Sequence, residues 1–128
     1  MRLKSVTIED VARYPLVTYD DRYNSGWVVQ REFQRHGLAP RIAARATDAT
    51  VIKANVAAGL GVAVLQKMAF EPSRDVDLKI VPTGPMFPSS MAAFTLRKDQ
   101  FLRDYARDFI GITAPQWSRK ALERALAR

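Results

Sequence analysis

The stretch 45–65 constrains the fold of this chain more than any other. A helix is predicted over 48–58, and Gly59 is the kind of residue at which helices end. The apolar run 60–65 that follows is typical of a strand buried on both faces. A strand predicted at 41–46 precedes this helix, so the stretch favours strands that alternate with helices.

The same alternation continues on both sides of this stretch. Before it, we expect a short helix over 6–12 capped by Thr7 or Ser5, a strand at 15–19 and a helix over 27–36 closed by Gly37. After it, we expect strands at 77–81 and 91–96. The tail should form a helix with one buried stripe, made of Phe101, Leu102, Tyr105, Phe109 and Ile110, and then a weaker amphipathic segment over 117–127. This order predicts an α/β sandwich with a largely parallel sheet, whose ligand crevice lies at the carboxyl ends of the strands.

Composition narrows the class of protein further. The chain has 128 residues, 48% of them hydrophobic, which is enough for one compact domain, and it carries neither a window of about 18 apolar residues nor a signal peptide. We therefore expect a cytoplasmic protein. The absence of cysteine excludes disulfides and thiolate-bound metals. The net charge of +7 favours association with polyanions in general. The basic residues from position 97 onwards, however, alternate with acidic residues at helical spacing, which favours a solvated helix face.

Small polar side chains gather at the predicted strand ends. The candidate ligand-binding residues are Thr47, Tyr19, Thr18, Asn24, Ser25 and Gly26, with Asp48 as a helix cap beside them. The first turn of a helix leaves up to four N–H groups unpaired and carries the positive end of the helix dipole, so it suits a small anion. Asp48 reads as the cap of this helix. For Thr47, capping and ligand binding remain equally open.

The sequence contains few candidates for catalytic residues. The one histidine, His36, falls at a predicted helix end, where a donor beside the last carbonyls is stabilising. Asp20 and Asp21 could act as an acid–base or cation-binding pair, but a solvated turn is the simpler reading. The Gly59-x-Gly61 pair follows a helix, the reverse of a dinucleotide fingerprint. We assign no catalytic residue, metal site or cofactor.

Three segments resemble the effector-binding domain of LysR-type transcriptional regulators, and within that family the CysB-like and Cbl-like subgroup that controls sulfur assimilation. They are YPLVTY at 14–19; GLAPRI at 37–42, continuing through ATDATVIK at 46–53 to GLGVAV at 59–64; and Arg97 with FLRDYARDFI at 101–110. The resemblance covers nearly the whole chain. It implies a three-layer α/β sandwich lobe of the type II periplasmic-binding-protein-like fold, in which ligands bind between two lobes.

The resemblance also implies a division of the chain and a class of ligand. Residues 1–95 correspond to the second lobe, residues 96–128 to the returning hinge strand and the C-terminal helices of lobe one, and the winged helix-turn-helix that would contact DNA has no counterpart here. A small anion such as acetylserine or sulfate is the implied effector, with Thr47 as a hydroxyl donor. The turn after Tyr19 departs from the family pattern, because it carries Asp20 and Asp21 and lacks the family's arginine, which weakens anion binding there.

The leading hypothesis is therefore the effector-sensing portion of a non-enzymatic regulator that controls DNA binding by the full-length protein. The alternative is a free-standing small-molecule binding module with no DNA role. An isolated lobe exposes the apolar surface that the other lobe would cover, so we expect a homo-oligomer and no membrane partner.

Overall fold

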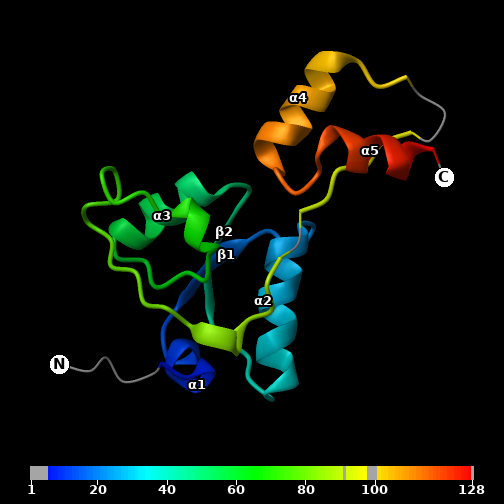
Figure 1. Ribbon diagram of the computed structural model, residues 1–128. Helices are drawn as coiled ribbons and strands as arrows, with labels where there is room; N and C mark the ends of the chain where they lie inside the picture. Colours follow the sequence, from blue (N-terminus) through cyan, green and yellow to red (C-terminus); the bar gives the residue numbers. More distant parts are fainter. Residues whose placement is uncertain (1–5, 91, 98–100, 128) are drawn as a thin grey trace. The chain divides into compact units, whose positions relative to one another are not determined.

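A computed structural model describes residues 6–90, 92–97 and 101–127 (Figure 1). The chain divides into two compact units, Met1–Ser89 and Ser90–Arg128. The first unit contains α1 (Ile8–Ala12), β1 (Leu16–Tyr19), α2 (Asn24–Arg35), β2 (Ile42–Ala46), α3 (Ala49–Ala57) and the 3₁₀ turns η1 (Lys67–Ala69) and η2 (Gly84–Met86). The second contains α4 (Asp104–Thr113) and α5 (Arg119–Leu126). Within the described ranges, no helix is long and apolar enough to cross a bilayer.

The predicted strands 15–19 and 41–46 form a parallel pair. β1 and β2 are in register from Val17 opposite Ala44 to Tyr19 opposite Ala46, after an irregularity at Leu16. On its other side β1 meets Val62: the Val17 N–H donates to the Val62 carbonyl at 2.8 Å, and the Val62 N–H donates to the Pro15 carbonyl at 2.9 Å. β1 is therefore hydrogen-bonded on both edges.

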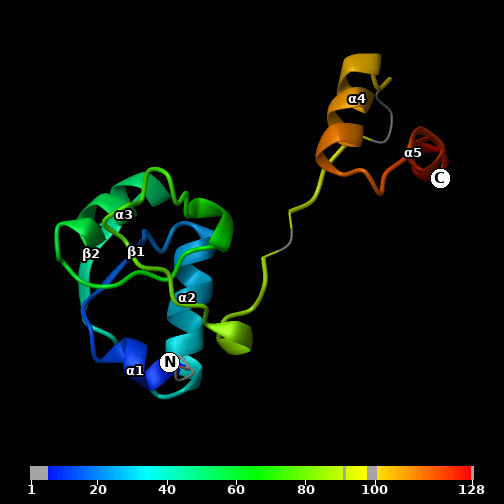
Figure 2. The ribbon, with the colours of Figure 1, turned by 60° about the vertical axis from the view of Figure 1, so that its left-hand side comes forward.

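Successive side chains of β1 point to opposite faces of this small sheet, as the pleat of a strand requires. Leu16 packs in one cluster with Ile8, Val29 and Phe33 from α1 and α2. Val17 packs in the other cluster with Ala46 and with Ile52 from α3. Helices thus cover both faces, as the two views show (Figure 1, Figure 2). The α/β prediction with three layers is confirmed.

The helix boundaries follow local sequence signals. Thr7 caps α1 in a reciprocal capping box with Asp10, and Asp48 caps α3. Gly37 follows α2 with a φ of +67°, a conformation that glycine adopts at little cost. α2 begins at Asn24, three residues before the predicted start, so the turn after β1 is shorter than expected.

Three predicted strands are wrong. In the segment 60–65 only Val62 forms a bridge, and Leu60 is 41% exposed, so this run is neither a regular strand nor buried on both faces. Residues 77–81 and 92–96 have no regular secondary structure, and Met91 lies outside the described residues. Strand propensity reports how well a side chain fits a pleated, half-buried surface, and these segments lack paired neighbours along their length.

The predicted buried stripe of the tail helix is also wrong in most of its members. Ile110 is buried with Ala114 and Leu122, but Phe101 and Tyr105 are 81% and 72% exposed. Phe109 meets Phe94 edge to face at 6.0 Å and is still 57% exposed. The periodicity of α4 is real, but within the described part of this unit only one edge of its apolar face is covered. The division into lobes at residue 95 stays a prediction.

Candidate functional site

The carboxyl ends of β1 and β2 bring two predicted site residues to one edge of the sheet. Tyr19 lies opposite Ala46 in the parallel register, and Thr47 is the next residue along the chain. The Asp20 N–H donates to the Ala46 carbonyl at 3.0 Å, which continues the pairing past the last strand residue. The sequence prediction that Tyr19 and Thr47 share this edge agrees with the register.

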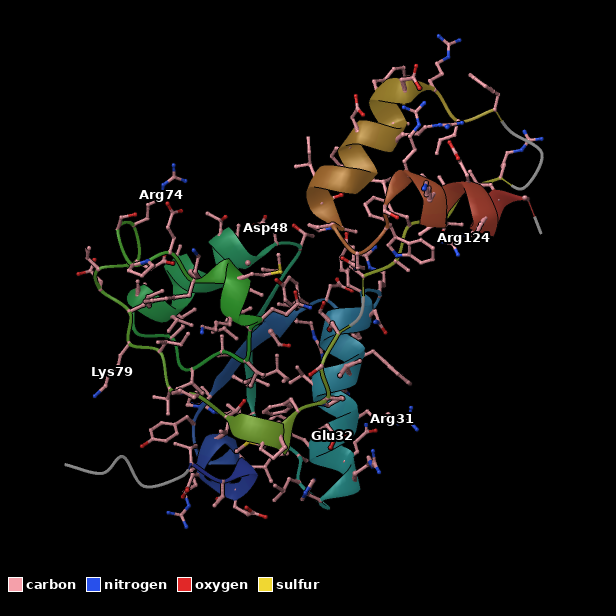
Figure 3. All side chains as sticks on the ribbon, in the orientation of Figure 1. Arg31, Glu32, Asp48, Arg74, Lys79 and Arg124 are labelled. Carbon is pink, nitrogen blue, oxygen red and sulfur yellow. The ribbon has the colours of Figure 1, made fainter. Side chains whose placement is uncertain are left out.

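The N-terminus of α3 opens at the same edge. The Asp48 carboxylate accepts hydrogen bonds from the Thr50 N–H at 2.8 Å and the Val51 N–H at 3.0 Å, and Figure 3 shows Asp48 at the start of this helix. Asp48 is therefore the cap, as the sequence indicated. Thr47 is exposed, and its hydroxyl forms no hydrogen bond with any residue that the structure describes. Thr47 is free to donate to a ligand.

Tyr19 supplies a second hydroxyl donor at this edge. Its side chain packs against the cluster of Val17, Ala46 and Ile52 and is partly buried. Burial raises the pKa of the Tyr19 phenol, and the negative charge of Asp48 raises it further. The phenol therefore stays protonated at neutral pH.

The N-terminus of α2 contributes differently from the prediction. Asn24 is exposed and Ser25 half-buried in the first turn, and no side chain caps this helix at Tyr23. Gly26 is buried, and a Cβ at this position would lie 2.7 Å from the Tyr19 carbonyl oxygen and 2.8 Å from that of Asp20. Gly26 thus allows the first turn of α2 to pack closely on the end of β1, which is a structural role.

The side chain of Thr18 lies on the face of the sheet opposite to that of Tyr19. Adjacent strand residues point to opposite faces, and Thr18 lines a cavity beside α2 while Tyr19 packs on the α3 side. Gln30 and Gln34 line the same cavity. Neither glutamine was predicted from the sequence, although their spacing of four residues within a helix places them on one face.

The charged residues of the turn after β1 are paired with each other and with β2. Arg22 Nε lies 3.0 Å from Asp20 Oδ1, and this hydrogen bond lowers the pKa of Asp20. Arg45 Nη1 lies 3.0 Å from Asp21 Oδ1. If Asp20 and Asp21 shared a proton, the pKa of one of the two carboxyl groups would be raised. The pKa of Asp20 is lowered instead, so nothing supports the hypothesis that the two aspartates act as an acid–base pair.

The remaining candidates for chemistry are structural. His36 follows α2, and its Nδ1 lies 2.9 Å from the Glu32 carbonyl oxygen, which is the stabilising helix-end role expected from the sequence. Across the described residues, no group of three histidine or carboxylate side chains is placed to hold a metal ion.

Lys53, the last residue of the ATDATVIK motif, anchors the irregular segment that follows the apolar run 60–65. Its Nζ lies 2.7 Å from Asp75 Oδ2, with the two side chains 17% and 9% exposed. The same carboxylate oxygen accepts the Glu71 N–H at 2.7 Å. The pair thus ties the turn 71–75 to α3.

Asp75→Asn should destabilise the protein at neutral pH and lose this effect in acid. The Glu71 N–H and then the Lys53 ammonium lower the pKa of Asp75 in the folded state. Stabilisation from a lowered pKa is present above the unfolded value, near about 3.9, and is lost as pH falls through the folded value. Urea midpoints should differ at pH 7, begin to approach each other below about pH 4, and meet only below the folded-state pKa of Asp75. Asp77→Asn, an exposed aspartate two residues on, is the matched control, and an equal effect there would contradict the assignment.

Comparison with known proteins identifies the family of the chain. Residues 2–118 match the family model described as the LysR substrate binding domain. The chain is 39% identical over 123 residues to the HTH-type transcriptional regulator CysB of Burkholderia cenocepacia, covering 96% of this chain and 39% of that protein. It is 37% identical over 112 residues to the regulator SsuR of the same organism, covering 88% of this chain and 36% of that protein.

A solved structure supports the fold. The crystal structure of the cofactor-binding domain of the Cbl transcriptional regulator matches with a TM-score of 0.79 at 24% identity, over 98% of this chain and 55% of that one. The chain spans well under half the length of the curated relatives named above. Because the family model matches nearly the whole chain and the CysB relative is 39% identical over 96% of it, this chain belongs to the LysR substrate-binding domain family, with CysB-like and Cbl-like relatives.

Proposed function

We propose that this chain is the effector-sensing portion of a LysR-type, CysB-like regulator that binds a small anionic metabolite between two lobes. In this proposal residues 1–95 belong to the second lobe and 96–128 return to the first. Ligand binding shifts the equilibrium between open and closed lobes, and the full-length protein, acting as a homo-oligomer, passes that shift to its DNA-binding domain.

One observation carries the proposal: a hydroxyl without a hydrogen-bond partner among the described residues lies at a helix N-terminus, on the carboxyl edge of a parallel sheet. Thr47 follows β2 directly and precedes the cap of α3, and the Tyr19 phenol stands at the end of the neighbouring strand. Ligands of open α/β sheets bind at this edge, and helix N-termini favour anions. Neutral donors fixed by backbone geometry would recognise the oxygens of a carboxylate or sulfate.

The local charges indicate how strongly such an anion would bind. Both arginines of this edge are committed, Arg22 to Asp20 and Arg45 to Asp21. Asp48 adds a negative charge, although its carboxylate is engaged by two helix amides. Binding of an anion then depends on neutral donors and the helix dipole, so the affinity of this lobe alone is weak. Lobe one must therefore supply part of the binding energy.

Thr47→Val should weaken binding of sulfate or acetylserine by about tenfold or more, because a hydrogen bond to a charged group contributes roughly 1.5–3 kcal/mol. The measurement is an amide chemical-shift titration of the 128-residue chain at low ionic strength, followed at the start of α3. In the full-length regulator the same change should abolish the response to inducer.

Thr50→Val is the matched control, since Thr50 is also exposed but lies inside the first turn of α3. It should leave the titration unchanged. Equal affinity for the parent and the Thr47 variant would remove Thr47 from the site, and the absence of saturable shifts with either anion would count against the anionic class of effector.

A further inference from the structure

The cavity that Thr18 lines lies between α2 and the sheet. It has a volume of about 130 Å³ and is lined by Leu16, Thr18, Gln30, Gln34, Leu38, Ala39, Pro40 and Ile42. All of these residues belong to the first unit. Tyr19 and Thr47 are not among them, so the cavity is separate from the proposed effector edge.

Three polar side chains that line this cavity form no hydrogen bond with any residue in the described ranges. Thr18 is 7% exposed, and its hydroxyl forms no hydrogen bond with the described residues. Among those residues no fully enclosed side-chain nitrogen or oxygen lacks a partner, so the Thr18 hydroxyl keeps some accessible surface, and this surface opens into the cavity. The side-chain amides of Gln30 and Gln34 likewise form no hydrogen bond with any described residue. Thr18 is almost buried, whereas Gln30 is half-buried and Gln34 is exposed, so a ligand gains most by giving the Thr18 hydroxyl a hydrogen-bond partner.

The walls determine the chemistry of the occupant. Leu16, Leu38 and Ile42 supply apolar surface, and none of the described residues that line the cavity is charged. An ion would lose hydration there without a counter-charge, which is costly. Threonine and glutamine each offer both a donor and an acceptor, which suits a neutral group that also has both. The volume is close to that of the roughly 150 Å³ engineered cavity that binds benzene, so it accommodates about six non-hydrogen atoms.

We propose that this cavity binds a small uncharged molecule with a primary amide or urea group and a short apolar body. The polar group meets the Thr18 hydroxyl and the two glutamine amides, and the apolar part contacts the leucine and isoleucine walls. This site differs from the anion site in residues, in face of the sheet and in ligand charge, so either proposal can fail alone.

The test compares isobutyramide with isobutyrate, which have the same number of non-hydrogen atoms and differ in charge. Titration of the ¹⁵N-labelled chain should shift the side-chain NH₂ signals of Gln30 and Gln34 with isobutyramide, saturating in the millimolar range, and isobutyrate should bind at least tenfold more weakly. Thr18→Val, which keeps the shape of the side chain, should weaken isobutyramide binding about three- to tenfold, the worth of one neutral hydrogen bond.

Two controls keep the outcome decisive. Thr50→Val makes the same change far from the cavity walls and should leave the titration unchanged; if Thr18→Val fails to fold, Gln34→Leu replaces it, with the exposed Gln66→Leu as its control. Binding of both ligands equally, or no loss with either cavity variant, would overturn the proposal. So would glutamine signals that shift with protein concentration in the absence of ligand, since a second copy of the chain would then fill the cavity.

Discussion

Gly61→Ala should destabilise the first unit by about 3 kcal/mol, a large share of the stability of a domain this size. A Cβ at Gly61 would overlap the carbonyl oxygen of Pro15 and lie 2.8 Å from its carbonyl carbon. Both atoms belong to the backbone. The same carbonyl accepts the hydrogen bond from the Val62 N–H that holds the apolar run 60–65 against β1. Relief of the clash would break that bridge. Urea denaturation followed by circular dichroism measures the loss.

Gly111→Ala provides the contrast. A Cβ at Gly111 would meet no atom within 4 Å, and the residue lies inside α4. Alanine costs less backbone entropy than glycine in a helix, so this variant should gain about 0.5–1 kcal/mol. A Gly61→Ala protein with the urea midpoint of the parent would show that the segment after α3 does not pack on β1 as described.

Phe33→Ala should be the most damaging core truncation, at about 3–5 kcal/mol. The Phe33 side chain is fully buried, packs with Leu16 and Val29, and meets Phe87 edge to face with ring centroids 6.0 Å apart. Its removal leaves a cavity between α2 and the sheet. Thermal and urea unfolding of the purified variant would measure the effect, and proteolysis should become faster.

Phe33→Leu separates lost volume from lost aromatic contact. Leucine refills much of the space, so this variant should lose roughly 1.5 kcal/mol. If the alanine and leucine variants unfold at the same urea concentration, the cluster around Phe33 is not the main core of the unit. An unaltered midpoint for both would contradict the burial of this side chain.

The sequence predicted the elements whose signals are local. Thr7 and Asp48 cap their helices, Gly37 follows α2, and the strands at 15–19 and 41–46 pair in parallel, because capping, helix termination and helix–strand alternation each depend on a few neighbouring residues. The strands predicted at 60–65, 77–81 and 91–96 failed because strand formation needs a partner strand, and propensity carries no information about partners. The exposure of Tyr105 on α4 has the same origin, since periodicity identifies an apolar face but not what covers it.

The part of the candidate site that follows from strand topology could be predicted from the sequence. Parallel strands bring Tyr19 and Thr47 to one edge whatever the side chains do. The direction of the Thr18 side chain follows from the two-residue period of a strand, but no local pattern indicates that Gln30 and Gln34 line the same cavity. The pairing of Arg45 with Asp21 also required coordinates, because it joins a turn to a strand more than twenty residues away.

The central position of β1 has a consequence for how the chain acquires its structure during synthesis. β1 precedes both segments that close its edges, which follow later in the chain, first β2 and then Val62. Translation at about 5–20 residues per second leaves the edge that Val62 covers without a partner for seconds. A strand edge without its neighbour is a template for pairing with other chains. The interval between emergence of β1 and emergence of Val62 is therefore when a nascent chain of this family is most exposed to aggregation, and when a chaperone would protect it best.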